Sequence, residues 1–216
     1  ISEDFNKDGL NDLAWITGTN GAYKLMIYQH QLTGTVHQFN AVDSMNIGFS
    51  FGQISSGDLD GDEKAEIIVT GRSDQNIYIF KNSSSNSIVS FQPEQSFNVL
   101  INTSAVVCAD LDGDNKKDLA FASDANSGVA ILKNQSTGSL AFELISLSTS
   151  APANFIQSAE IDNQGNPELM IGFLDQGFAV FRNQSTGGAV SFADMDQFNY
   201  NYESRPLSFL NIHAAD

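Results

Sequence analysis

Cysteine is almost absent from this sequence: Cys108 is the only one, so no disulfide can form within the chain. A disulfide-stapled secreted fold is therefore excluded. No apolar run approaches the roughly 18 residues that a membrane helix requires, so we expect no membrane insertion. Basic residues are also scarce, with 10 Lys and Arg against 26 Asp and Glu. The net charge of −16 argues against nucleic acid and against an anionic membrane surface as partners.

Motifs of enzymes are missing as well. The sequence has neither a Gly-rich phosphate loop nor a Gly-x-Ser-x-Gly nucleophile motif. His30, His37 and His213 have no spacing that would gather them at a metal or beside a nucleophile. Carboxylates are abundant, but their clustering favours cation binding over proton transfer. We therefore expect that the chain is not an enzyme.

An acidic nine-residue pattern recurs four times and defines an internal repeat. It begins at Asp4, Asp58, Asp110 and Glu160, with steps of 54, 52 and 50 residues. We interpret residues 1–216 as a single region of such repeats. The predicted repeats cover approximately residues 4–57, 58–109, 110–159 and 160–208, and residues 209–216 form the first strand of a further or closing unit.

Each repeat continues with short runs of β-branched and aromatic residues between turn residues, which predict strands. The first run after the acidic loop is Leu13–Ile16, Ile67–Val69, Leu119–Ala122 or Leu169–Ile171. The second is Lys24–Tyr28, Ile77–Phe80, Val129–Leu132 or Phe178–Phe181, and the third is Val36–Phe39, Ile88–Phe91, Leu140–Phe142 or Val190–Phe192. The segment that leads into the next acidic loop supplies a fourth strand. No segment shows a sustained helical period, so the fold is predicted to be all-β.

Four strands in about 50 residues is the size of one blade of a β-propeller, in which each small sheet packs on its neighbours. The sequence therefore predicts a propeller region with four four-stranded blades. Two arrangements fit it: a closed four-bladed ring, or an arc of a larger propeller. An arc would expose apolar blade faces, which would require a partner or self-assembly through these faces.

The acidic pattern has the spacing of a calcium-binding loop. Side chains at loop positions 1, 3 and 5, the carbonyl of position 7 and a carboxylate at position 9 supply the oxygen ligands that calcium prefers. The predicted ligands are Asp4, Asn6, Asp8, Leu10 and Asp12 in the first loop, Asp58, Asp60, Asp62, Lys64 and Glu66 in the second, and Asp110, Asp112, Asp114, Lys116 and Asp118 in the third. Without a cation, carboxylates this close would repel one another strongly. We therefore predict about three calcium ions, in the first three loops.

The fourth loop departs from this pattern, and a metal-bound and a metal-free form both remain open for it. Its corresponding residues are Glu160, Asp162, Gln164, Asn166 and Glu168. Glu160 is long for position 1, and Gln164 places a neutral amide where the other loops have an acid. At position 6 the second loop has Glu63, which tolerates a left-handed backbone less well than the Gly or Asn of the other loops. The second loop is therefore expected to be strained or differently shaped.

These loops, each followed by a short strand, resemble the FG-GAP (or VCBS) repeats of integrin α-subunit propellers and of many bacterial surface proteins. Phe51-Gly52 and Val69-Thr70-Gly71 are similar to the two halves of the family's name, and Asn134–Phe142 is similar to the turn and strand of bacterial members. The resemblance covers the whole chain. It implies an extracellular or cell-surface calcium-binding propeller, although members commonly close with seven blades and this sequence supplies four repeats.

Two functions follow from this interpretation. The first is adhesion, recognition of a protein or glycan ligand, or assembly of a filament or scaffold. The alternative is a non-catalytic accessory propeller of a secreted enzyme of the polysaccharide lyase or phospholipase type.

Four Asn-x-Ser/Thr sequences match the acceptor pattern for glycosylation. Their acceptor residues are Asn82, Asn102, Asn134 and Asn183. Three of them fall at the same place in successive repeats, where Asn and Ser are also ordinary turn residues. Glycosylation and turn formation therefore both remain open for these sites.

Overall fold

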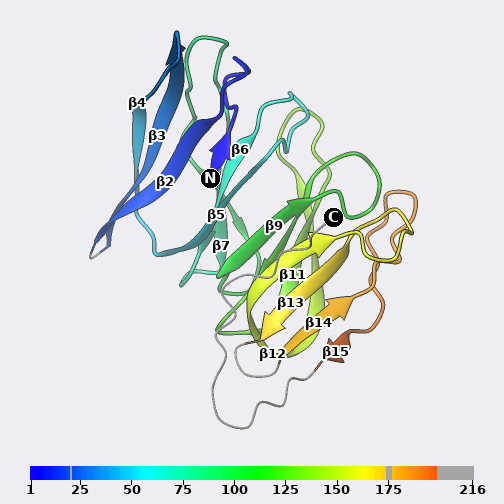
Figure 1. Ribbon diagram of the computed structural model, residues 1–216. Coiled ribbons are helices and arrows are strands. Elements are labelled where there is room, and N and C mark those ends of the chain that lie inside the picture. Colours follow the sequence, from blue (N-terminus) through cyan, green and yellow to red (C-terminus); the bar gives the residue numbers. More distant parts are fainter. Residues whose placement is uncertain (20, 174–176, 199–216) are drawn as a thin grey trace.

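The computed structural model describes residues 1–19, 21–173 and 177–198, and these residues form an all-β fold of antiparallel sheets (Figure 1). No helix occurs among them, and so none that could cross a membrane. The first sheet has the strand order β1-β2-β3-β4. Its strands are β1 (Ser2–Glu3), β2 (Asp12–Thr19), β3 (Ala22–Thr33) and β4 (Val36–Ile47). We call this sheet the first unit.

The second unit is a four-stranded sheet with the order β5-β6-β7-β8. Its strands are β5 (Phe51–Gly57), β6 (Glu66–Gly71), β7 (Asn76–Phe80) and β8 (Gln95–Asn98). The predicted all-β fold is thus confirmed, and each acidic loop lies between the first and second strands of a sheet rather than at its start. The predicted repeat boundaries therefore divide each sheet after its first strand.

The remaining strands form a seven-stranded sheet with the order β15-β14-β13-β12-β11-β10-β9. Its strands are β9 (Ala105–Ala109), β10 (Asp118–Ala122), β11 (Ser127–Asn134), β12 (Phe142–Ala159), β13 (Glu168–Phe173), β14 (Gly177–Phe181) and β15 (Asp196–Phe198). The long strand β12 pairs with β11 in its first half and with β13 in its second half. We therefore call β9–β11 with the first half of β12 the third unit, and the second half of β12 with β13–β15 the fourth unit.

The predicted third strands are wrong in the second and fourth units, and in the third unit only Phe142 of Leu140–Phe142 lies in a strand, at the start of β12. Ile88 and Phe91 make only isolated bridges, to Ser85 and Asn82, and the corresponding bridges recur around Val190–Phe192. The outer strands are instead β8 and β15, several residues further along. A serine in the preceding turn causes this, because the Ser84 hydroxyl accepts from the Ser90 backbone N–H at 3.0 Å and holds the chain in a local turn. The predicted strand at 209–216 lies outside the described residues.

The units pack on one another in chain order, and each junction uses the same positions. Between the first and second units, Leu25 and Ile27 of β3 contact strand β6 residues in one buried cluster. Ile77 and Ile79 take their place between the second and third units, and Val129 and Ile131 between the third and fourth. The apolar residue at loop position 2 joins each cluster, as Phe5, Leu59 and Leu111.

The described units form an open series. In Figure 1 the sheet of β2, β3 and β4 lies at the opposite end of the molecule from β13, β14 and β15. Of the two arrangements that fit the sequence, the closed four-bladed ring is therefore not formed by residues 1–19, 21–173 and 177–198.

Candidate metal loops

The second and third loops share one pattern of backbone contacts. At position 1, Asp58 accepts hydrogen bonds from the N–H groups of Gly61 at 2.8 Å and Glu63 at 2.9 Å. Asp110 accepts the equivalent bonds from Gly113 and Asn115, both at 2.8 Å. These contacts curl the loop around the acid at position 1, as in an Asx turn. The same backbone contacts therefore give the second and third loops one shape.

Positions 4 and 6 have a left-handed backbone in all four loops. The φ angles at position 6 are 87° for Gly9, 66° for Glu63, 67° for Asn115 and 100° for Gly165. Glu63 thus adopts the same conformation as Asn115, so the second loop is strained but keeps the shape of the third. Position 4 is a glycine in these two loops, Gly61 and Gly113, which allows its positive φ at little steric cost.

The acids at position 9 are buried at the base of each loop. Glu66 accepts the N–H of Leu59 at 2.8 Å, and Asp118 accepts that of Leu111 at 2.9 Å. Burial, which disfavours the charged form, raises the pKa of Glu66 to about 7 and that of Asp118 to about 6. Burial also raises the pKa of Asp12 in the first loop. A cation next to these carboxylates would relieve this penalty.

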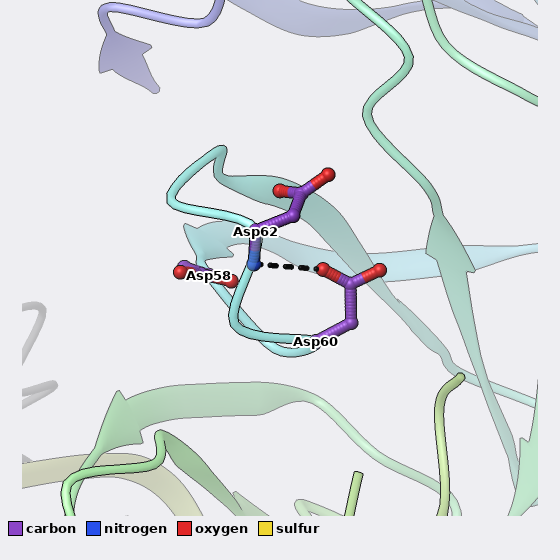
Figure 2. Close-up of side chains that lie close together, drawn as sticks. All are labelled: Asp58, Asp60 and Asp62. Carbon is purple, nitrogen blue, oxygen red and sulfur yellow. Dashed lines mark hydrogen bonds between the residues drawn. The ribbon is translucent and has the colours of Figure 1, made fainter. Parts of the chain in front are cut away.

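Carboxylate oxygens converge in three of the loops. In the second loop, oxygens of Asp58, Asp60 and Asp62 lie within 4.8 Å of one another (Figure 2). Asp110, Asp112 and Asp118 converge in the third loop, and Glu160, Asp162 and Glu168 in the fourth. The fourth loop thus brings three acids together although Gln164 replaces the usual acid. The predicted carbonyl ligands Leu10, Lys64 and Lys116 stay predictions.

The fourth cluster also contains a polar atom without a partner. Glu168 is completely buried, and its Oε1 atom has no hydrogen-bond partner among the described residues. Its other oxygen accepts the N–H of Ile161 at 2.9 Å. An unpaired buried carboxylate oxygen is costly, and a cation is one group that could satisfy it.

The first loop is arranged differently because position 3 is an amide. The Asn6 side-chain nitrogen donates to the Asp8 carboxylate at 3.0 Å, so these two predicted ligands contact each other. Asp8 also accepts the N–H of Leu10 at 2.9 Å. The first loop does not contain one of the three-acid clusters of the described residues.

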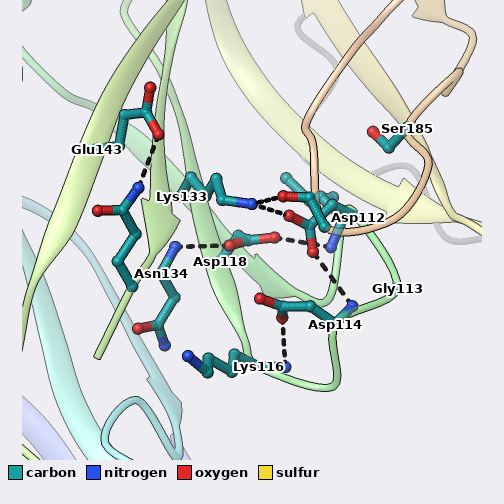
Figure 3. A network of polar contacts seen from close by, with 12 residues as sticks. Asp112, Gly113, Asp114, Lys116, Asp118, Lys133, Asn134, Glu143 and Ser185 are labelled. Atoms are coloured by element: carbon teal, nitrogen blue, oxygen red, sulfur yellow. Dashed lines mark hydrogen bonds and ion pairs between the residues drawn. The ribbon is translucent and has the colours of Figure 1, made fainter. Parts of the chain in front are cut away.

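A lysine contacts the position 3 acid in the second and third loops, which the sequence analysis missed. Lys81 pairs with Asp60, and Lys133 pairs with Asp112 (Figure 3). These hydrogen bonds raise the pKa of both lysines, so both stay charged. Each lysine directly precedes an Asn-x-Ser sequence, but this local motif does not indicate which acid the lysine contacts. At the same place the fourth unit has Arg182, which pairs with Asp196 instead.

Comparison with known proteins places these loops in a family. The model of the FG-GAP-like repeat matches residues 4–69 and 58–121, which together are more than half of the chain. The chain belongs to the FG-GAP-like repeat family. Each match spans two successive acidic loops, so the first three loops lie within matched FG-GAP-like repeats. A search of curated proteins finds no match to the chain.

The FG-GAP-like units are joined by asparagines at three of the glycosylation candidates. The Asn82 side-chain nitrogen donates to the carbonyls of Phe5 at 2.9 Å and Ala65 at 3.0 Å. Phe5 is position 2 of the preceding loop, and Ala65 is position 8 of the loop in the same unit. Asn134 repeats this with Leu59 and Lys117, and Asn183 with Leu111 and Pro167. We call this residue the clamp asparagine.

The clamp contacts argue against glycosylation at these residues. A glycan would attach to the amide nitrogen, which here bonds two carbonyls, and Asn82 and Asn134 are only 1% exposed. Turn formation is the alternative that the contacts support, because each side-chain oxygen accepts the N–H two residues further on. Asn102 lies elsewhere, half-buried between β8 and β9, and remains a candidate.

The FG-GAP-like unit at the N-terminus has a histidine at the clamp position. The N–H of His30 donates to Asp12 at 2.8 Å, as that of Asn134 donates to Asp118 at 2.7 Å. The structure also brings His30 and His37 together, contrary to the sequence interpretation, with 2.8 Å between Nε2 of His30 and Nδ1 of His37. The turn between β3 and β4 causes this contact, because it folds the two strands into a hairpin.

Proposed function

We propose that this chain is a calcium-binding part of a β-propeller, built from four-stranded blades, that recognises a protein or glycan at the cell surface or outside the cell. The four units are the proposed blades, and the open series is the proposed arc of a larger propeller. Its role is adhesion or scaffolding, and it is not an enzyme.

One observation carries the proposal: three acids converge in each of the second and third loops, and each loop has a buried acid at position 9, which is Glu66 beside the cluster of the second loop and Asp118 within the cluster of the third. The donors are oxygen atoms, which suit a hard cation such as Ca²⁺ rather than a softer metal. Asp58, Asp60, Asp62 and Glu66 would hold the ion in the second loop. The bound ion would fix the loop and neutralise carboxylates that are costly to bury.

The loops suit a recognition module because they recur on neighbouring sheets and because a bound ion would fix each of them. Family membership supports an extracellular location, since FG-GAP-like repeats typically belong to extracellular proteins. The overall negative charge favours a neutral or basic partner over a polyanion. Three bound calcium ions would change the formal net charge from −16 to −10.

Titration calorimetry with CaCl₂ tests the proposal, with MgCl₂ as the comparison. We expect about three ions per chain, and a lower melting temperature in excess chelator because ligand binding to the folded state is lost. Heats equal to the buffer blank, with an unchanged melting temperature in chelator, would contradict structural calcium.

Two variants rank the loops. Asp112→Ala in the third loop should remove one ion, and it should lower the melting temperature in calcium more than Asp162→Ala in the fourth loop. The sequence places the third ion in the first loop, whereas the converging acids favour the fourth. Comparison of the stoichiometry of Asp4→Ala with that of Glu160→Ala assigns this ion, because only one of the two variants should lose it.

A further inference from the structure

The outer face of the fourth unit carries apolar residues at the positions that are buried where two units pack on each other. On this face the described residues leave them partly exposed. Position 2 of the loop is 0% exposed at Phe5, 1% at Leu59 and 0% at Leu111, but 52% at Ile161. The same contrast holds along the second strand after the loop. Phe178 is 39% exposed, whereas the equivalent Val129 of the third unit is 1% exposed.

These residues form one continuous surface. Phe178 stacks on Phe198 with 4.9 Å between ring centroids, and Val180 lies two residues along the same strand. An open hollow of about 390 Å³ lies next to them. Its apolar side is formed by Ile161, Val180 and Phe198, and its polar side by Arg182, Asp196 and the loop residues Asp162, Gln164 and Glu168. We call this surface the end face. It continues the row of buried junctions between the units, so a sheet of the same kind fits it.

The internal junctions show what such a sheet must carry. At each of them the clamp asparagine of the following unit donates to the carbonyl of position 2 in the preceding loop, at 2.8 to 2.9 Å. The carbonyl of Ile161 is the equivalent acceptor on the end face. An asparagine suits this contact because its amide offers two N–H groups, one for the preceding loop and one for position 8 of its own loop.

The first unit lacks this group. Its clamp residue is His30, whose Nε2 contacts His37 at 2.8 Å and whose ring stacks on Phe39 with 4.6 Å between centroids. Nε2 and the ring face are therefore engaged within the hairpin of the first unit, and Nδ1 is buried without a hydrogen-bond partner among the described residues. A neutral imidazole also has a single N–H group, so it cannot supply both bonds of the clamp.

We propose that the end face is a docking surface for a further repeat of this type that carries a clamp asparagine, and that it discriminates against the first unit of this chain because of His30. This inference rests on the propeller arrangement proposed above. It identifies the partner of the end face by chemistry: an apolar sheet face with one asparagine at its rim.

A cysteine at the end face makes docking measurable. Ile161→Cys places an accessible thiol there, whereas burial raises the pKa of the native Cys108 thiol to about 12 and keeps it slow to react. A disulfide reagent that releases a coloured thiolate then reports the exposure of residue 161. All measurements use the full chain in saturating calcium.

Two matched chains serve as docking partners in excess. One carries His30→Asn and Ile161→Asp, and the other carries Ile161→Asp alone, so neither offers an intact end face of its own. We expect the partner with His30→Asn to slow labelling at residue 161 at least 10-fold at saturation, and the partner with His30 to leave the rate nearly unchanged. Thermal melting of both partners confirms that each is folded.

Three results would overturn the proposal: equal protection by both partners, protection by neither, or slow labelling of the Ile161→Cys chain alone. Should His30→Asn fail to fold, the same selectivity is measurable at an internal junction. Asn183→His in a Leu111→Cys chain should then speed labelling at residue 111, and an unchanged rate would contradict the inference. Calcium binding is measured separately by calorimetry. Failure of the calcium proposal would therefore appear as missing binding heats, whereas failure of the docking proposal would appear in the labelling rates.

Discussion

Removal of one clamp asparagine should destabilise the whole chain, and Asn134 is the sharpest case. Its side-chain nitrogen donates to Leu59 and Lys117, both at 2.9 Å, and its oxygen accepts the N–H of Ser136 at 2.9 Å. In Asn134→Ala these three backbone groups lose their partner at a site that is 1% exposed. Each lost bond is worth about 1 kcal/mol, so we expect a loss of about 3 kcal/mol.

For a chain of this length, 1 kcal/mol corresponds to a shift in melting temperature of about 2–4 °C, so Asn134→Ala should melt about 6–12 °C lower. Thermal melting and urea unfolding in saturating calcium measure the effect. Asn40→Ala is the matched control, because Asn40 makes an exposed side-chain hydrogen bond to Gln31. It should change the free energy of unfolding by less than about 0.5 kcal/mol.

An aspartate at the same site separates hydrogen bonding from packing. Asn134→Asp keeps the shape of the side chain but turns its donor toward two carbonyls into an acceptor, next to the Asp118 carboxylate. It should therefore destabilise the chain more than Asn134→Ala does. A loss below about 1 kcal/mol for the alanine variant, or an aspartate variant as stable as the native chain, would refute the role of the clamp.

Two further predictions concern the loops. Glu63→Gly should raise the free energy of unfolding by about 1 kcal/mol, because glycine removes the penalty of a left-handed backbone. Asn115→Gly should raise it less, because asparagine already tolerates this conformation. Equal gains for the two variants in urea unfolding would contradict this explanation. In chelator, the raised pKa values of Glu66 and Asp118, about 7 and about 6, mean that the folded state binds protons more tightly than the unfolded state. The contribution of these two acids to stability should therefore be greatest below about pH 4 and be lost as the pH rises through 6 and 7. Saturating calcium or Glu66→Gln should flatten this fall, which urea unfolding across pH measures.

Much of this architecture could be predicted from the sequence because it repeats. The first strands after the loops are short, apolar and bounded by acidic turns, so Ile67–Val69 and Leu119–Ala122 are confirmed within β6 and β10. The third strand was placed in the first unit, where Val36–Phe39 lies within β4, but not in the second and fourth units. Near Ile88 the local pattern is that of a strand, but hydrogen bonds of the Ser84 hydroxyl hold the chain in a turn, and such contacts leave no periodic signal.

The candidate site was only partly predictable for a similar reason. Alternation of acids identified the loops, since calcium ligation imposes its own spacing. The pairing of Lys133 with Asp112 depends on strands β10 and β11 lying side by side, which no local motif encodes. The asparagine contacts join neighbouring units through residues more than 70 positions apart in sequence, as from Asn134 to Leu59. In the sequence these asparagines resemble glycosylation acceptors, and only the fold shows that their amide groups donate to backbone carbonyls.

The unbroken strand β12 gives the two halves of the chain different modular properties. Short connections at residues 48–50 and 99–104 separate the first three units. Gly48, Ser50 and Leu100 are exposed in them, so a protease or an inserted segment has an accessible site there. No such joint exists between the third and fourth units, because one strand of 18 residues belongs to both. An insertion in its first half would shift the pairing of residues 142–147 with β11, and one in its second half would shift the pairing of residues 153–159 with β13. These two units should therefore be lost, exchanged or inherited only as a pair, whereas the first two can be exchanged one at a time.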